Sequence, residues 1–553
     1  MGIGGALHQR RMSRLWPFLL ILAVVVLGPI VLRPKGDASM LEGQDRVVAI
    51  TPHNEAIRAE FSRGFREWYL SKTGRTVVVD FRSPGGTSEI TRFLLGAYNA
   101  TFQQHWREKL RQPWTSETEG AWSNARLELD DTPADDTPAE AARRAFLQSE
   151  VSCGMDLFFG GGSFDFQRVA AQGFVVDSGY VAAHPEVFGN TIPLMVGGEP
   201  YFDPKGRWMG TTIGAFGIAY NRDQLARLGI PEPRQWADLA DPRYFRGLAL
   251  ANPTQSSSAN KAFEMLIQEQ MNEEIAARGN GNALAPEAEA EAVAEGWTRA
   301  MRLLQKISAN ARYFSDSSAK ISLDVESGEA AAGMTIDFYG RFQSEAVRRA
   351  DGSSRIGYTN AEGGTSFGVD PIGLLRGAPN REVALAFIEY VMGDGQKLWG
   401  WRPGTPGGPR EYALRRLPIV PELYAPEYRA LRSDPEVFPY EDAKAFTYVE
   451  ARTGRLFSVF AFIIRVMCID AHPELKGAWR ALNDAKARLG HYPPEALAAF
   501  EDVSRVSYTL AKGPLRDGVG NANKLAQVQL AKELADAFRT NYERAAALAA
   551  EGK

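Results

Sequence analysis

Short apolar runs alternate with stretches of helical periodicity once the N-terminal forty residues are passed. Val47 to Ile50 (VVAI) has the pattern of a buried strand, and residues 51–74 place apolar side chains at helical spacing, with Thr51 as the expected N-cap. A second strand pattern, Thr76 to Phe81 (TVVVDF), leads through the glycine-bearing turn Pro84 to Thr87 into another helical stretch. This β-α-β-α order predicts a parallel sheet with helices on its faces, which is an α/β fold.

The alternation returns after a polar interruption. Residues 97–150 contain the tandem DDTPADDTPAE and are expected to form a surface insertion, in which Thr137 to Glu140 has the pattern of a capping box that opens a helix. Met155 to Phe166 (MDLFFGGGSFDF) resumes the order of strand, glycine turn and helix, and Gly210 to Asn221 predicts a long strand. Beyond Pro406 the pattern is mostly helical to the C-terminus, so we expect a helical C-terminal extension.

An uncharged stretch near the N-terminus indicates where the chain is sent. Leu15 to Leu32 follows three arginines and, as a helix, would be roughly 27 Å long, enough to approach the thickness of a bilayer core. We expect an uncleaved signal anchor that places the rest of the chain in the periplasm, attached to the inner membrane. The alternative is a signal peptide cleaved near Gly36-Asp37-Ala38, which would release a secreted protein.

Composition narrows the class of function. The 553 residues carry a formal net charge of -4, so no basic surface for nucleic acid is expected. Cys153 and Cys468 are far apart and offer neither a disulfide framework nor a cysteine-rich zinc site. The GxSxG, HExxH and P-loop motifs are absent and the six histidines are dispersed, so we expect a protein that is not an enzyme and that needs no cofactor.

Four segments together resemble the extracellular solute-binding proteins of ABC importers, in the branch that binds iron(III) or organic anions. They are residues 156–163 (DLFFGGGS), 211–259, 315–340 and 364–398. The resemblance implies the two-lobed type II periplasmic binding fold, with a ligand held between the lobes. It also implies a small-molecule ligand and the permease subunits of an ABC transporter as partners.

The resemblance, together with the patterns above, implies the following organisation. Residues 1–36 would form the cytoplasmic N-terminus and the transmembrane anchor. The first lobe would consist of residues 46–210, with an insertion at 97–150, and the chain would return to it at residues 360–400. The second lobe would consist of residues 211–359, and residues 401–553 would form a helical C-terminal region packed on it.

Glycine-bearing turns and Ser/Thr clusters precede several predicted helices. Such turns present backbone N–H groups and the positive end of the helix dipole, which suit an anion. The candidate ligand-binding residues are Thr51, His53, Gly86, Thr87, Gly161, Gly162, Ser163, Ser256, Ser257, Ser258, Ser317 and Ser318, together with Arg82 for a charge-assisted hydrogen bond. The Ser, Thr and Gly residues have an alternative role as simple helix caps, and Arg82 has one as an exposed strand end.

The ligand's chemistry depends on whether these residues hold a metal. In the iron-binding relatives, the resemblance places a histidine at His53, a glutamate where this chain has Gly161, and a tyrosine pair where it has Phe338 and Tyr339. One imidazole and one phenol do not complete an iron site, so no metal is expected. We expect a small organic anion, with Asp337 receiving a ligand ammonium or hydroxyl group and Tyr339 as a wall of the cleft. The alternatives are ferric ion, or a membrane-anchored sensor or interaction protein built on the same fold.

Overall fold

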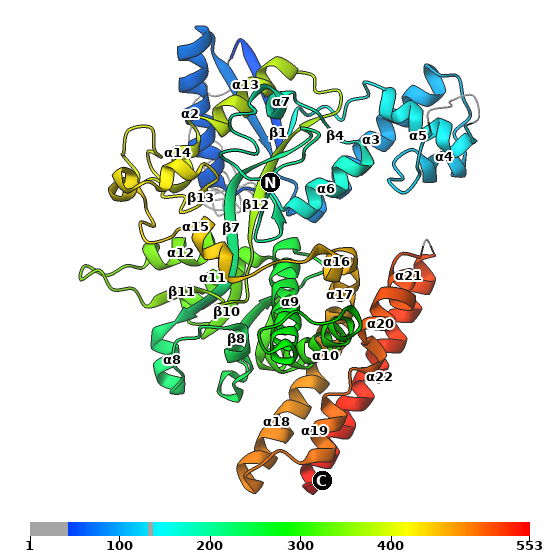
Figure 1. The fold of residues 1–553 in the computed structure, drawn as a ribbon, viewed down its shortest axis with the longest axis vertical. Helices are drawn as coiled ribbons and strands as arrows, with labels where there is room; N and C mark the ends of the chain where they lie inside the picture. Colours follow the sequence, from blue (N-terminus) through cyan, green and yellow to red (C-terminus); the bar gives the residue numbers. More distant parts are fainter. Residues whose placement is uncertain (1–42, 131–135, 522) are drawn as a thin grey trace, which may run out of the picture.

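The computed structural model describes residues 43–130, 136–521 and 523–553. The chain forms two lobes stacked along its long axis and joined by strands that pass from one to the other (Figure 1). The two-lobed α/β architecture expected from the sequence is therefore confirmed. The expected transmembrane anchor at residues 1–36 lies outside the described residues.

A mixed sheet runs through both lobes. Its strands are β1 (Asp45–Ile50), β2 (Val77–Arg82), β3 (Leu157–Phe159), β4 (Val175–Val176), β7 (Met209–Asn221), β8 (Leu248–Ala251), β9 (Ala311–Ser315), β10 (Ala332–Ile336), β11 (Ile356–Asn360), β12 (Phe367–Leu375) and β13 (Leu417–Pro418). Across the described residues the strand order is β2-β1-β3-β12-β7-β10-β8-β9, with β4 on β12, and β11 and β13 on β7. A separate hairpin pairs β5 (Met195–Val196) with β6 (Glu199–Pro200).

The first lobe is built on the parallel strands β1, β2 and β3. Val47 to Ile50 are all buried, because helices cover both faces of this part of the sheet. The helices are α2 (Glu55–Thr73), α3 (Thr87–Glu108), α6 (Ser163–Gln172), α7 (Tyr180–Ala183), α13 (Arg381–Met392) and α14 (Gln396–Gly400). α2 is capped by Asn54, whose side chain accepts from the Ile57 N–H, and not by Thr51 as the sequence suggested.

The second lobe is built on β8 to β11 and the second half of β7. β10 and β11 both pair antiparallel with residues 216–221 of β7, while β8 and β9 continue the sheet in parallel. Its helices are α8 (Arg222–Leu228), α9 (Ser257–Gly279), α10 (Pro286–Asn310), α11 (Ser318–Ser327) and α12 (Asp337–Ala346).

Two long strands connect the lobes. Residues 209–215 of β7 pair with β12 in the first lobe, and the remainder of β7 pairs with β10 and β11 in the second. The register of β12 on β7 shifts between Asp370 and Pro371, where Pro371 interrupts the ladder. A third connection follows Ala443, which packs in the first lobe's core, and leads through Phe446 and Tyr448 into the second lobe.

The insertion forms a helical arm on the first lobe. α3 extends to Glu108 and is followed by α4 (Ser116–Ala121) and α5 (Pro138–Gln148). The predicted capping box is present, because the Thr137 side chain accepts from the Glu140 N–H and the Glu140 carboxylate accepts from the Thr137 N–H. Arg143 anchors the arm, since its buried guanidinium donates to the Trp122 carbonyl at 3.1 Å and to the Gln172 carbonyl at 2.7 Å.

The chain after residue 400 differs from the uniform helical region expected there. Leu414, Leu417 and Ile419 lie in the core of the first lobe, and β13 pairs with β7. Sequence periodicity missed this strand because it is two residues long and its neighbours are mostly short 3-10 turns. Residues 401–443 therefore complete the first lobe.

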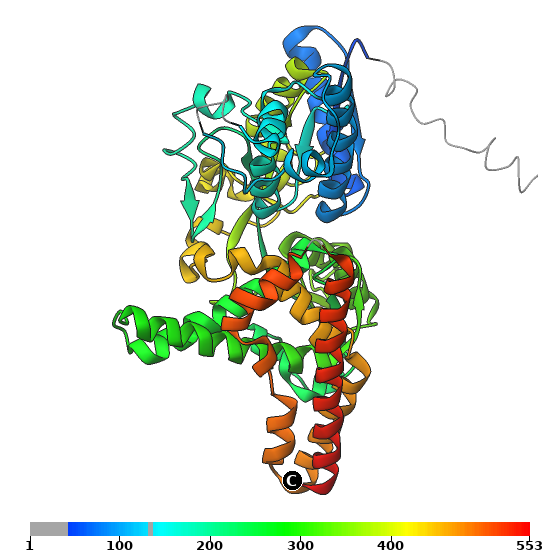
Figure 2. The ribbon, with the colours of Figure 1, turned by 90° about the vertical axis from the view of Figure 1, so that its right-hand side faces the viewer.

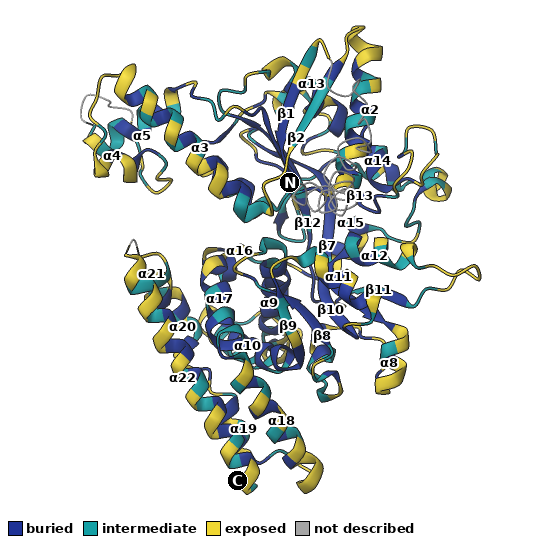
Figure 3. Cartoon of the chain, turned by 180° about the vertical axis from the view of Figure 1, so that it is seen from behind, coloured by how far each residue is buried: buried dark blue, intermediate teal, exposed yellow. Residues whose placement is uncertain are grey.

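From residue 450 the chain is helical and packs on the second lobe. The helices are α16 (Glu450–Thr453), α17 (Phe457–Ile464), α18 (His472–Leu489), α19 (Pro494–Phe500), α20 (Tyr508–Leu510), α21 (Arg516–Val519) and α22 (Lys524–Glu551), with the short α15 (Pro439–Asp442) preceding them. Figure 2 shows α22 running along the long axis away from the first lobe. The buried stripe of α22 faces α18 and α19, while its outer side is exposed (Figure 3).

None of the described helices alone is long and apolar enough to cross a membrane. The pair Glu450–Ile469 and His472–Leu489, which is bent by 63°, meets the requirements of length and composition only when the two helices are taken together. Phe460, Ile463 and Trp479 of this pair are buried in the core of the second lobe.

Candidate functional site

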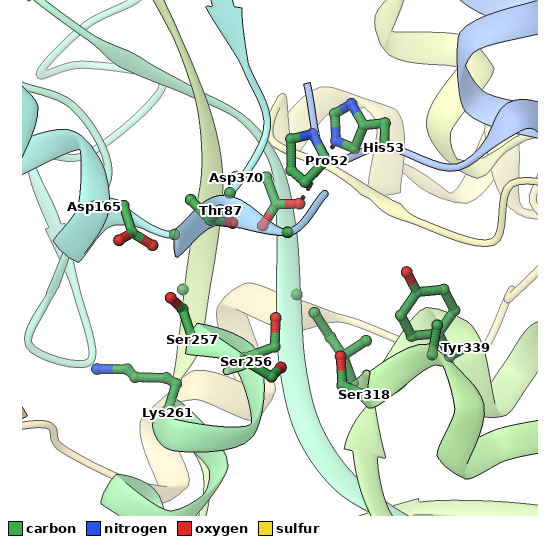
Figure 4. Close-up of a pocket in the computed structure, with 18 of the residues that line it drawn as sticks. Pro52, His53, Thr87, Asp165, Ser256, Ser257, Lys261, Ser318, Tyr339 and Asp370 are labelled. Carbon is green, nitrogen blue, oxygen red and sulfur yellow. Dashed lines mark ion pairs between the residues drawn. The ribbon is translucent and has the colours of Figure 1, made fainter. Parts of the chain in front are cut away.

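A cavity of about 660 Å³ lies between the two lobes (Figure 4). Residues from both lobes line it, and it lies where the helices α2, α3, α6, α9 and α11 begin. Of the fifteen candidate ligand-binding residues, the cavity is lined by twelve: His53, Gly86, Thr87, Gly161, Gly162, Ser163, Ser256, Ser257, Ser258, Ser317, Ser318 and Tyr339. The structure thus brings together turns that are far apart in the sequence.

Helix N-termini give the cavity its hydrogen-bond donors. Within the described residues, α3, α6 and α11 begin at Gly86, Gly162 and Ser317 without a side-chain cap, so their first-turn N–H groups are not satisfied by a capping side chain. α9 differs, because the Ser256 side chain accepts from the Ala259 N–H at 3.3 Å. Uncapped N-termini attract negative charge through the helix dipole.

One glycine in this region is required by close packing between turns. Gly161 has a φ of 115°, and a Cβ built there would lie 2.8 Å from Cγ2 of Thr87. The turn after β3 and the start of α3 therefore approach each other more closely than a side chain at position 161 would allow.

Three candidate residues lie outside the cavity lining. Thr51 is buried and its Oγ1 accepts from the His53 N–H, while Arg82 points to solvent and pairs with Asp80 at 2.7 Å. Asp337 is buried and lies 3.2 Å from Nη1 of Arg341, measured from its Oδ2. The expected contact of Asp337 with a ligand is therefore replaced by an ion pair one turn along α12.

His53 lines the cavity as an uncharged ring. Its imidazole packs edge-on against Phe159 and Trp399, at centroid distances of 4.6 Å and 5.6 Å. Burial lowers the pKa of His53, and the nearby Asp370, 3.8 Å from Nε2, does not overcome this effect. His53 is therefore neutral at physiological pH.

An ion pair that the sequence did not reveal lies beside His53. Arg416 donates through Nη2 to Oδ2 of Asp370 at 2.6 Å, and its guanidinium lies 4.2 Å from the ring centre of Phe338. Burial alone would raise the pKa of Asp370, but the charge and hydrogen bond of Arg416 together with the interaction with His53 outweigh it, and the pKa is lowered. Both residues line the cavity, although Arg416 comes from the region after residue 400.

Charged groups also line the opposite end of the cavity. Lys261 of α9 lies 2.8 Å from Glu199 of β6 and 3.0 Å from Glu264, measured between Nζ and the carboxylate oxygens. Burial would lower the pKa of Lys261, but the two glutamates raise it. Asp165, in the first turn of α6, is the remaining buried carboxylate at this end. Sequence reasoning missed these residues because the pair of Lys261 with Glu199 joins two distant elements. The i,i+3 spacings of Lys261 with Glu264 and of Asp165 with Arg168 were local signals that could have pointed to them.

A bound metal ion needs several donor side chains around one point. In the part of the chain that the structure describes, no group of three or more His, Cys, Asp or Glu side chains is placed to hold a metal ion. Tyr339 faces the cavity, and burial raises the pKa of its hydroxyl, which disfavours the phenolate that ferric ion prefers.

The chain was compared with known families and structures. A family model described as bacterial extracellular solute-binding protein matches residues 155–397. The phosphoglycerate transport regulatory protein PgtC of Salmonella typhimurium is 25% identical over 302 residues, which is 53% of this chain and 61% of that protein. An uncharacterized protein of Haemophilus influenzae is 26% identical over 255 residues, covering 45% of this chain and 61% of its own length. The chain thus matches about 61% of the length of these curated relatives.

The periplasmic binding protein AfuA of Actinobacillus pleuropneumoniae, with exogenous fructose-6-phosphate bound, aligns with a TM-score of 0.46 and 14% identity, covering 76% of this chain and 99% of that one. Residues 155–397 are thus similar to the bacterial extracellular solute-binding proteins.

Proposed function

We propose that the protein captures a small organic anion in the interlobe cavity and delivers it to the permease of an ABC importer. The observation that carries this proposal is the meeting of three N-termini without side-chain caps, those of α3, α6 and α11, at one cavity. Each charge-assisted hydrogen bond to an anion is worth about 1.5–3 kcal/mol. A few such bonds are enough for micromolar capture.

Two of the cationic side chains that line the cavity are already paired with carboxylates, whereas a third, Arg58 of α2, has an Nε that is buried without a hydrogen-bond partner. Arg416 is paired with Asp370, and Lys261 with Glu199 and Glu264. The ligand's anion would therefore be held by backbone N–H groups, by hydroxyls such as those of Thr87 and Ser318, and by the guanidinium of Arg58. This arrangement favours an oxyanion, because it offers several donors around one centre and needs no single strong counter-charge.

The name of the Salmonella relative concerns the transport of phosphoglycerate. A phosphorylated or carboxylated small acid is accordingly the first class of ligand to test here. Because that name also includes a regulatory role, a sensor function is the second candidate. In that case the helices after residue 450 would form the surface that binds a partner.

The binding test uses calorimetry on the purified exported region with a panel of phosphorylated and carboxylated acids. Ser318→Ala removes a hydroxyl at the start of α11 and should weaken binding roughly 10-fold or more. Ser327→Ala, at the far end of the same helix, where the hydroxyl donates to the Asp324 carbonyl, is the matched control and should bind normally.

Ferric ion remains the competitor because His53 and Tyr339 lie at the same end of the cavity (Figure 4). If the protein ignores the anions, binds ferric citrate and becomes coloured through a tyrosine-to-iron transition that Tyr339→Phe abolishes, the organic-anion proposal is wrong.

We further propose that residues 15–32 anchor the protein in the inner membrane with the lobes in the periplasm. Protease added to spheroplasts should then digest the lobes and spare a cytoplasmic marker. Deletion of residues 2–36 should leave the protein in the cytoplasm, and protection of the full-length chain from protease would contradict the proposed orientation.

A further inference from the structure

A buried carboxylate lies where two of the cavity's helices begin. Asp165 is in the first turn of α6, and its side chain is 3% exposed. Figure 4 shows it on the same side of the cavity as Ser257, the first residue of α9, and Lys261. The lobes meet at this point, since Oγ of Ser257 is also 3.1 Å from Oγ of Ser88 on α3.

The groups around Asp165 leave its charge incompletely balanced. Arg168 lies 3.4 Å away through Nη2, but its side chain is 44% exposed and the same nitrogen donates to Oγ1 of Thr91 at 2.6 Å. Lys261 is held by Glu199 and Glu264, so the net charge of that cluster is negative. An anionic group of a ligand placed at this end would therefore meet negative potential.

We infer that Asp165 determines which second group the ligand carries: its carboxylate accepts a hydrogen bond from a hydroxyl or ammonium and repels another anionic group. This refinement rests on the proposed function, because it assumes that the first anionic group is bound mainly by the N-termini of α3 and α11, whereas the first turn of α6 carries Asp165. It assigns to Asp165 the role that the sequence suggested for Asp337, whose carboxylate is already paired with Arg341.

The protonation state of Asp165 makes this selectivity depend on pH. Burial raises its pKa to about 6, against the opposing effects of Arg168 and of a hydrogen bond from Ser257. At neutral pH the carboxylate is charged, so it repels a second anionic group of the ligand. Below about pH 6 it becomes a neutral acid, and the repulsion of a second anion disappears.

Two probes of nearly the same shape separate these states. Glycerol 3-phosphate and 3-phosphoglycerate differ by a hydroxymethyl group in place of a carboxylate, and their shared phosphate cancels in the ratio of the two affinities. Calorimetry at about pH 7.5 should show the wild type preferring glycerol 3-phosphate by roughly tenfold or more, with a smaller preference at about pH 5.

Asp165→Asn should reduce the preference at about pH 7.5 to the value of the wild type at about pH 5 and remove its dependence on pH. Asp517→Asn is the control, because Asp517 of α21 is a carboxylate that is 74% exposed and does not line the cavity, and it should leave the preference unchanged. The pH series on the unaltered protein keeps the test valid even if the variant folds poorly.

The outcomes distinguish the two levels of the proposal. If both probes bind and their ratio changes neither with pH nor in Asp165→Asn, the role of Asp165 is wrong while anion capture stands. If neither probe nor any other anion of the panel binds the wild type, the proposed function is rejected and this inference with it.

Discussion

Arg416 donates a hydrogen bond of 2.6 Å to Asp370 at the wall of the cavity. This bond links the residue just before β13 to β12. The Arg416 side chain is only 1% exposed, so its charge depends on this carboxylate. The family segment ends at residue 397, and a residue beyond it completes the cavity.

Asp370→Asn should therefore destabilise the protein strongly, because it leaves a buried guanidinium without a counter-charge. We expect a loss of about 3–5 kcal/mol in the free energy of unfolding, measured by urea denaturation. Glu436→Gln breaks the pair with Arg429, in which both side chains are more than half exposed, and should cost about 1 kcal/mol or less. Equal losses in the two variants would contradict the importance of burial.

Stability should also depend on pH through Asp165. Its pKa is about 6 in the folded protein and 3.8 in a model peptide, so the folded state binds the proton more tightly. This stabilisation is complete below about pH 4 and is lost as the pH rises through about 6. Asp165→Asn should consequently be more stable than the wild type at about pH 8, by up to ~3 kcal/mol, and the difference should shrink towards about pH 4. Urea denaturation at both pH values measures the difference, and a gain that is the same at both would show that Asp165 is not the titrating group.

Gly198 should not tolerate a side chain. It has a φ of 83°, and a Cβ there would lie 1.9 Å from the Tyr448 carbonyl oxygen of the third connection between the lobes. Gly198→Ala should cost several kcal/mol, whereas Gly179→Ala, with a φ of 79° and open space around it, should cost about 1–2 kcal/mol from backbone strain alone. Thermal denaturation of both variants measures the two losses of stability. Equal losses would show that the close contact between Gly198 and the Tyr448 carbonyl is unimportant.

Removal of residues 450–553 should prevent the second lobe from folding. Trp479 and Phe500 share a core with Trp297 of α10, and the Trp297 indole donates to the Val506 carbonyl at 2.8 Å. The truncated chain would expose this core, so we expect insoluble or rapidly proteolysed protein. A chain lacking residues 1–42 is the control and should remain soluble; a well-folded truncation at residue 449 would show that the C-terminal helices are a separate unit.

The sequence predicted those parts of the cavity that depend on local pattern. Gly86, Gly162 and Ser317 were placed at helix starts because an apolar strand, a small or polar turn and a helical period follow one another along the chain. Their presence at one cavity follows from the α/β arrangement, in which the carboxyl ends of parallel strands share an edge.

The charged residues of the cavity were not predictable in the same way. Arg416 pairs with Asp370, which is 46 residues away in the chain, and Lys261 pairs with Glu199 of the other lobe, so sequence spacing does not reveal these two pairs. Asp337 was placed in the cavity because it directly precedes Phe338 and Tyr339, the pair that the resemblance placed there. The i,i+4 spacing of Asp337 and Arg341 was a readable sign of an ion pair along the helix, but periodicity does not tell which face of α12 is buried.

The helix α22 acts as a lever arm for any movement of the second lobe. Its 28 residues span about 42 Å, and it runs away from the connecting strands β7 and β12 (Figure 2). For every ~10° by which the second lobe turns about those strands, the far end of such a rod travels on the order of 7 Å. A movement of a few ångströms around a bound solute is thereby enlarged at the outer tip of the molecule, where a molecule in contact with that tip would register whether the cavity is filled.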